Sequence, residues 1–456
     1  MDLKKNLVKV FSADFIGFIV GIINSFLIPA FLGLEQYSYL KTYALYLSYV
    51  GILHFGFIDG IHIKYGGKTK DKLRISLLKY EHNFILQFQI LVTVGFLIVA
   101  CFLKNFVLMA FALSIVPINM RTFFSFLYQA IGELSLYVRL RIIPPMLNLI
   151  FSLSIIFLLK INSYIPFVLA NLTVSYVLYT MFELQYIQTM NISGVSVEKD
   201  FKEIKKLFIS GAFVMLGNLS TILVYSLDRW FVKFLLTTQD FAYYSFAISM
   251  MSILNMLISS VALTFYPYLA RGYSEEQIRS IKKYMIIIGS LGSFGYFILG
   301  FLVNTFLRKY VPSLNVIAIL FAGYPAVAVI NALYVNLYKV NKQEKKYFWT
   351  VFSMVIISFT FNLMAVIINK NNQTIAFATT ISFFVWFFYS SKDFKGLETS
   401  KEEIMFIVLY LPTFLFSTLC LDLAIGAIFF GVGISLLIFG FYRKEFLELT
   451  KKILSK

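Results

Sequence analysis

The stretch VFSADFIGFIVGIINSFLIPAFL, residues 10–32, decides the class of protein. Its single charged residue is Asp14, and about 20 mostly apolar residues suffice to cross the hydrocarbon core of a bilayer, so the stretch predicts a membrane-spanning helix. Asp14, Gly17, Gly21 and Asn24 follow one another at spacings of three and four residues, which places them on one face of that helix. Glycines on such a face are typical of close helix packing. An ionisable side chain at membrane depth normally faces a partner or a water-filled cavity, so Asp14 is a candidate functional residue.

Comparable apolar stretches follow along the rest of the chain. The sequence of 456 residues is 59% hydrophobic and only 14% charged, which excludes a water-soluble enzyme. No connection between stretches exceeds about 20 residues, so we expect no extramembrane domain. The sequence predicts an all-α integral membrane protein with about 14 transmembrane helices, near residues 10–32, 38–61, 83–103, 105–128, 140–159, 163–185, 207–232, 241–269, 284–305, 312–337, 347–368, 373–390, 402–420 and 423–442.

The basic residues set the orientation. A net charge of +17 would suggest a nucleic-acid partner in a soluble protein. With the N-terminus in the cytoplasm, however, 31 of the 40 Lys and Arg residues fall on the inner side, among them Arg141, and 7 fall on the outer side, among them Lys41. This asymmetry predicts that both termini are cytoplasmic, and it accounts for the charge without nucleic acid. Two basic residues, Arg121 and Arg229, remain inside predicted spans.

The chain also has the pattern of an internal duplication. A shift of 204 residues aligns the first span with the seventh and brings Asn24 onto Asp228. Two repeats with the same orientation predict two pseudo-symmetric six-helix bundles about an axis along the membrane normal, with a central cleft. The expected divisions are an N-terminal bundle, a cytoplasmic linker, a C-terminal bundle, and two extra helices with a cytoplasmic tail, at residues 1–190, 191–206, 207–392 and 393–456.

Intramembrane charges are the main candidates for chemistry. Arg121 either snorkels to the inner interface or binds an anion in the cleft, because a guanidinium suits phosphate oxygens. Asp228 and Arg229 are adjacent in the sequence and form either a local interfacial ion pair or part of a cavity. Asp59 lies near a cytoplasmic helix end, where a solvated carboxylate is the simpler interpretation. His54 reads as a buried, hydrogen-bonded histidine rather than a proton relay.

Other classes of site have no sequence support. The chain has no phosphate-binding loop of the Gly-rich Lys-Ser/Thr type, and its three histidines lack metal-site spacing. We therefore expect no metal and no organic cofactor. A membrane enzyme such as a glycan polymerase would need a sizeable charged outer loop, and the sequence has none, so the chain is predicted not to be an enzyme.

Several motifs resemble one family of transporters. The stretches LGLEQYS at 32–38 and GFIDG at 56–60 resemble the first hairpin of the Wzx-type oligosaccharide flippases, of the multidrug/oligosaccharidyl-lipid/polysaccharide exporter superfamily. YQAIG at 128–132 is similar to the helix 4–5 turn of that family, and 228–245 with FYP at 265–267 resembles its helix 7–8 region. The turn at 237–240, TTQD, departs from the Gly-containing turn that is common there.

The resemblance implies a twelve-helix core and two peripheral helices in a bacterial cytoplasmic membrane. It implies a flippase that translocates undecaprenyl-diphosphate-linked oligosaccharide repeat units by alternating access, for a surface polysaccharide such as O-antigen or capsule. Its partners would be the lipid-linked oligosaccharide, membrane lipids and a glycan polymerase. Basic and polar cavity residues would bind the substrate, and acidic residues would couple transport to H⁺ or Na⁺. The candidates are Arg121, Arg229 and Asn24 for the first role and Asp14, Asp228 and Asp59 for the second.

Two other functions fit the same sequence. A cation-coupled multidrug exporter of the same fold would need an anionic, aromatic cavity, whereas an anionic lipid headgroup needs cationic residues. Arg121 therefore favours the flippase. A flippase for a lipid II-type peptidoglycan precursor also stays open.

Overall fold

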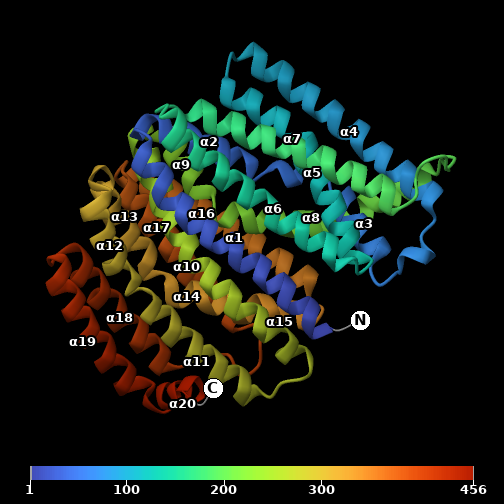
Figure 1. Ribbon diagram of the computed structural model, residues 1–456. Coiled ribbons are helices and arrows are strands. Elements are labelled where there is room, and N and C mark those ends of the chain that lie inside the picture. The colour runs from blue at the N-terminus through green and yellow to red at the C-terminus, as the bar shows by residue number, and fades with distance from the viewer. Residues whose placement is uncertain (1–2, 455–456) are drawn as a thin grey trace. The chain divides into compact units, whose positions relative to one another are not determined.

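A computed structural model describes the backbone of residues 3–454 and the side chains of residues 12–259, 262, 265–266 and 268–451. Within these residues every regular element is a helix (Figure 1). The chain divides into two compact units, one up to Ile222 and the other from Leu223 on. The division falls inside a helix, Phe201–Val224, whereas the expected linker 191–206 mostly precedes that helix.

The first unit is built around its fourth span. It contains α1 (Leu3–Phe31), α2 (Leu34–Leu47), α3 (Phe57–Tyr65), α4 (Ile75–Phe102), α5 (Phe106–Ala130), α6 (Leu134–Leu153), α7 (Tyr164–Thr189) and α8 (Phe201–Val224) up to Ile222. Helix α5 packs against α2, α3, α4, α6 and α7, and α1 packs along α6 (Figure 1). Most of the α5 span is buried inside the protein, as expected for the central helix of a bundle.

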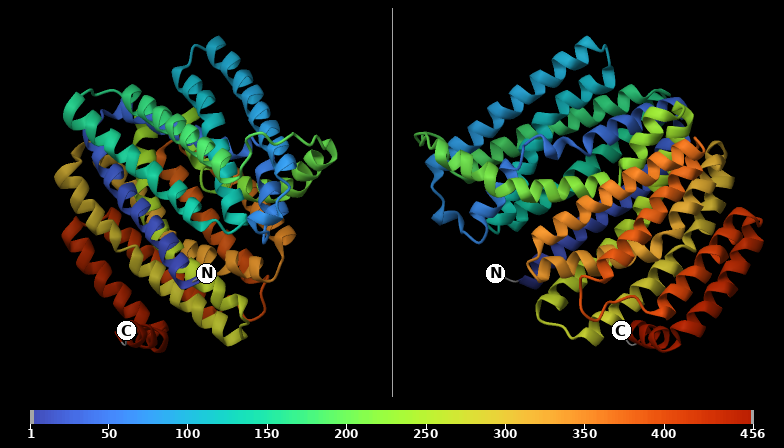
Figure 2. Two further views of the ribbon diagram at one scale, coloured as in Figure 1. Left: turned by 45° about the vertical axis from the view of Figure 1, so that its right-hand side comes forward. Right: turned by 180° about the vertical axis from the view of Figure 1, so that it is seen from behind.

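The second unit is also built around a buried central span. Its helices are α9 (Leu227–Leu235), α10 (Thr238–Ala270), α11 (Glu275–Gly292), α12 (Gly295–Phe306), α13 (Leu314–Ala322), α14 (Tyr324–Val329), α15 (Val335–Val340), α16 (Glu344–Ile368), α17 (Asn372–Ser391), α18 (Lys401–Leu419), α19 (Leu423–Phe441) and α20 (Arg443–Leu454). The continuous series α13–α15 is almost wholly buried and contacts α10, α11 and α17. Helices α18 and α19 lie side by side at one edge of the unit (Figure 2).

The number of spans agrees with the sequence. Among the described residues, twelve helices are long and apolar enough to cross a membrane, and two bent pairs raise the number to 14. Each of the fourteen predicted stretches overlaps one of these spans. This confirms the all-helical, multi-pass membrane architecture.

Breaks within spans were not predicted. The second span bends by 52° between Leu34–Ile52 and Phe57–Tyr65, and the tenth bends by 50° between α13 and α14. At the first break Gly56 has a φ of 85°, a left-handed conformation that favours glycine. There is also no room for a side chain at this position, because a methyl group on Gly56 would lie 2.7 Å from the backbone of Ala212 in α8.

Short polar turns begin several helices. Thr237 and Asp240 form a reciprocal capping box at the start of α10, in which each side chain accepts a hydrogen bond from the other residue's backbone N–H. The turn that departs from the family pattern is therefore a helix start whose N–H groups are satisfied by side chains. Ser400 and Glu403 form the same motif at the start of α18.

Candidate functional site

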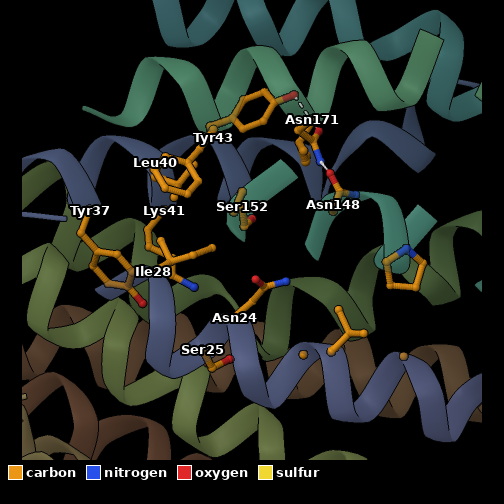
Figure 3. Close-up of a pocket in the computed structure, with 17 residues that line it drawn as sticks. Asn24, Ser25, Ile28, Tyr37, Leu40, Lys41, Tyr43, Asn148, Ser152 and Asn171 are labelled. Carbon is orange, nitrogen blue, oxygen red and sulfur yellow. Dashed lines mark hydrogen bonds between the residues drawn. The ribbon is translucent and has the colours of Figure 1, made fainter. Parts of the chain in front are cut away.

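A cavity of about 370 Å³ lies within the first unit, between α1, α2, α6 and α7. Figure 3 shows the side chains of Asn24, Lys41, Asn148 and Asn171 around this space. Its polar lining also includes Ser25 and Ser152, and its 17 lining residues include no Asp or Glu. We call this space the amide cavity.

The face of α1 that was recognised in the sequence forms one wall of the amide cavity. Gly17, Gly21, Asn24 and Ile28 all line it, as their spacing of three and four residues requires. A methyl group on Gly17 would meet no atom of the described structure within 4 Å. The glycine therefore leaves open space here, instead of allowing another helix to pack closely.

The opposite wall is held by a chain of hydrogen bonds. The Tyr43 hydroxyl lies 2.8 Å from Ser114 Oγ and 3.1 Å from Asn171 Oδ1. Asn171 Nδ2 lies 3.3 Å from Asn148 Oδ1 and donates to it (Figure 3). These contacts fix the orientation of two of the three amides. The third, Asn24, has a buried Oδ1 with no hydrogen-bond partner in the described structure.

The polar residues lie at one depth in the unit. Asn24 is seven residues before the end of α1, while Lys41 and Asn171 are seven residues after the starts of α2 and α7. These ends lie together, because the Gly33 N–H donates to Asn162 Oδ1 at 3.1 Å and the Tyr164 N–H donates to Gln36 Oε1 at 3.1 Å. At 1.5 Å per residue, all three side chains start about 10 Å from that end. In the predicted orientation this is the outer half of the membrane.

Arg121 does not line the amide cavity. It is fifteen residues after the start of α5, about 22 Å from the same end by helical rise. The side chain is half-buried, and its guanidinium makes no hydrogen bond or ion pair with any described residue. Arg121 and Asn24 are thus separated by about 12 Å along the unit.

Asp14 is paired with a basic residue of α6. Its Oδ1 lies 2.9 Å from Nη2 of Arg141, and Nη1 of Arg141 donates to the Tyr137 hydroxyl at 2.6 Å. The sequence assigned Arg141 only to the inner loop charges. In the structure it neutralises the carboxylate that was the candidate for ion coupling.

Asp59 is buried at the break between α2 and α3, so the expectation of a solvated carboxylate was wrong. It is 4% exposed, and its Oδ2 lies 3.8 Å from Nε2 of His54. The Gly56 N–H lies 3.2 Å from Nδ1 of His54, which therefore accepts the bond and leaves the proton on Nε2, towards Asp59. His54 is buried and hydrogen-bonded, as predicted. The backbone of the break is satisfied by Asn119, which donates to Val50 O at 3.2 Å.

Asp228 is a buried carboxylate in the second unit. It is 2% exposed and accepts hydrogen bonds from the Tyr244 hydroxyl at 2.7 Å and the Thr379 hydroxyl at 3.3 Å. Its other oxygen accepts from the Arg229 N–H at 2.7 Å. Among the described contacts, no ion pair within 4.0 Å joins the Asp228 and Arg229 side chains. Nε of Arg229 is buried and has no hydrogen-bond partner in the described structure.

The described side chains contain no group of three or more His, Cys, Asp or Glu residues that could hold a metal ion. The residues that sequence reasoning missed are those of the amide cavity other than Asn24. Lys41 had been counted among the outer charges, and Asn148 and Asn171 had not been singled out. The available signal was one amide in each of three apolar spans, 7 to 11 residues from the outer end of the span.

Comparisons with known proteins identify the fold. No family model matches the chain, and no curated protein matches it by sequence. Among solved structures, the lipid II flippase MurJ in an inward closed conformation matches with a TM-score of 0.71 and 13% identity, over 96% of this chain and 99% of that one. The MATE multidrug transporter DinF-BH matches with a TM-score of 0.55 and 16% identity, over 85% and 94% of the two chains. An inward-facing MATE family transporter of the MOP superfamily matches with a TM-score of 0.54 and 11% identity, over 83% and 95%. The chain therefore has the fold that these solved transporters share.

Proposed function

We propose that this protein is a flippase for undecaprenyl-diphosphate-linked oligosaccharide repeat units in a bacterial cytoplasmic membrane. It would move them to the outer leaflet by alternating access, for synthesis of a surface polysaccharide, and would hand them to a glycan polymerase. The fold supports a transporter, since the matching structures are transporters or flippases. The substrate has to be argued from the lining of the cavity.

The observation that carries this proposal is the chemistry of the amide cavity. Three Asn, two Ser, two Tyr and one Lys supply its polar groups, and no carboxylate lines it. Amides and hydroxyls both donate and accept hydrogen bonds, which suits a ring bearing several hydroxyl groups. An organic cation would instead favour a carboxylate in such a site. The lining therefore favours a glycan over a cationic drug.

Charged residues outside the amide cavity are assigned to the diphosphate and to ion coupling. Arg121 and Arg229 are our candidates for the diphosphate, because guanidinium groups bind phosphate oxygens in a bidentate manner and neither has a hydrogen-bond partner for its Nε in the described structure. Asp228 is the strongest candidate for coupling to H⁺ or Na⁺. Its carboxylate is buried among hydroxyl groups, whereas Asp14 is paired with Arg141.

A second candidate is a flippase for a lipid II-type precursor. It is favoured by the MurJ match, which covers nearly the whole of both chains with a TM-score of 0.71. Both candidates share a diphosphate-linked glycan on a polyprenyl lipid, so they differ only in the group that the diphosphate carries. A multidrug exporter of the same fold is the third outcome that the experiment below separates.

The test is transport in proteoliposomes made with the purified full-length protein. A fluorescent undecaprenyl-diphosphate oligosaccharide, a fluorescent lipid II and a cationic dye are supplied in parallel. Movement of each lipid is followed by its accessibility to a reagent that does not cross the membrane. We expect transport of the oligosaccharide lipid above that in protein-free vesicles.

The transport results distinguish the three candidate functions. Faster movement of lipid II than of the oligosaccharide lipid would establish the second candidate. Accumulation of the dye without movement of either lipid would overturn the flippase assignment. The same preparation carrying Asn24→Leu serves as a matched variant, because it removes a lining amide while preserving the approximate size of the side chain.

A further inference from the structure

The amide cavity has more specific chemistry than a generic glycan site. Three parts of its lining differ in character: the hydrogen-bonding amides, a single formal charge, and an apolar surface formed by residues such as Ile28, Leu40 and Phe167. All of them belong to the first unit. Its volume of about 370 Å³ lies at the lower end of the range for small-molecule sites, about 300–1,000 Å³.

Two of the amides that line this space have hydrogen-bonding groups without a partner among the described residues. Asn24 Oδ1 is a buried acceptor without a partner, and leaving such a group unsatisfied costs about 1–3 kcal/mol. On the other wall, Asn148 accepts from Asn171 through its oxygen, which leaves its own Nδ2 donors without a described partner. One acceptor and one donor thus lie on opposite sides. A ring whose hydroxyl groups can both donate and accept would satisfy both.

The charge of the amide cavity is positive. Lys41 is the only ionisable acid or base in its lining other than the tyrosines. Its Nζ lies 5.2 Å from the centroid of the Tyr37 ring, so the ammonium is held at the wall by a cation–π contact. An ammonium about 10 Å inside a span, with no carboxylate lining the same space, strongly favours a negatively charged ligand.

We propose that the amide cavity binds a single sugar ring that carries a negative charge, either a carboxylate on the ring or a phosphate attached to it. Asn24 and Asn148 bind the ring hydroxyls, and Lys41 binds the anionic substituent. The proposal rests on the proposed transport of a glycan lipid, and it adds the chemical class of the sugar that occupies this site. A neutral ring would form no ion pair with the ammonium group.

Binding is measured on the full-length protein in nanodiscs of phosphatidylcholine, by saturation-transfer NMR titration. The probes are methyl glucuronide, glucose-1-phosphate and methyl glucoside at millimolar concentrations. We expect both anions to bind about tenfold more tightly than the neutral glucoside, because only the anions form an ion pair with the ammonium of Lys41. A preference for the glucuronide identifies a carboxylated ring. A preference for the sugar phosphate identifies a ring that carries a phosphate.

Variants assign the effect to single residues. Lys41→Gln should lower the affinity of the anions to that of the glucoside, and Lys41→Arg should retain the preference. Asn148→Ala should weaken all three probes and leave their ratio unchanged. The matched control is Lys370→Gln, because Lys370 is an exposed lysine of the second unit outside the amide cavity.

Several results would overturn the proposal. These are equal affinity for the neutral and anionic sugars, an unchanged preference in Lys41→Gln, or no saturable binding of any probe. The binding and transport assays together distinguish a failure of this sugar site from a failure of the proposed flippase function. If the anion preference depends on Lys41 but no lipid moves in proteoliposomes, the site stands and the flippase assignment falls. If the lipid moves but Lys41→Gln changes neither binding nor transport, only the sugar assignment falls.

Discussion

Filling the amide cavity from α1 with a large side chain should weaken substrate binding and transport without unfolding the protein. We propose Gly17→Ala and Gly17→Leu, since a methyl group at this position meets no described atom within 4 Å. The alanine replaces a helical glycine at no steric cost, so the free energy of unfolding should stay the same or rise by up to about 1 kcal/mol. The leucine places four carbon atoms in the space that a bound ring requires.

The expected loss of affinity follows from the hydrogen bonds that the bound ring could no longer make. Displacement from Asn24 and Asn148 removes two neutral hydrogen bonds, each contributing about 0.5–1.5 kcal/mol. Affinity should therefore fall about 5- to 150-fold in Gly17→Leu and little in Gly17→Ala. The assays are lipid transport in proteoliposomes and thermal unfolding followed by size-exclusion fluorescence.

Gly60 provides a matched control, which tests whether the stability assay responds to steric conflict. A methyl group on Gly60 would lie 2.8 Å from the carbonyl carbon of Leu207, so Gly60→Ala must push α3 away from α8. Overpacking of this kind costs about 1–3 kcal/mol. If Gly17→Leu transports and binds sugar like the unmodified protein, the amide cavity is not the substrate site and the reasoning is wrong.

Three further predictions concern single residues. Arg121→Ala should abolish transport of the diphosphate-linked lipid and Arg121→Lys should restore part of it, because a point charge replaces the guanidinium fork; unaffected transport in the alanine variant would remove Arg121 from the mechanism. Asp228→Asn should make transport in proteoliposomes insensitive to imposed H⁺ and Na⁺ gradients, and a retained response would exclude Asp228 from coupling. Lys282 and Glu403 form a buried ion pair at 2.7 Å, so Lys282→Met should lower stability by about 3–5 kcal/mol and Glu403→Leu in the same chain should recover most of it; equal melting temperatures for the single and double variants would contradict this.

The sequence predicted the spans well, because each span is a continuous apolar stretch whose length is imposed by the bilayer. It did not predict where spans break. The break at Gly56 depends on the approach of α8, which lies about 150 residues further along the chain, and no local pattern reports that contact. The tenth span bends beside Pro325, so there the sequence contained a usable signal.

The site was predicted only in part. Charged residues were chosen because their burial is costly, and this criterion found Asp228 and Arg121. It could not show that Asp14 is neutralised by Arg141, since pairing depends on how α1 and α6 face each other. It also passed over Asn148 and Asn171. Neutral amides carry a smaller penalty than charges, so their positions become informative only when the packing brings them together.

The amide cavity lies wholly within one compact unit of the chain. A ligand bound there keeps the same contacts as long as that unit moves as one body, so its affinity for the site need not differ between the two directions of access. A site with equal affinity in both states cannot favour either of them. Such a protein would be a reversible carrier as far as the sugar is concerned, and net movement would be set by removal of the product on the far side or by an ion bound elsewhere.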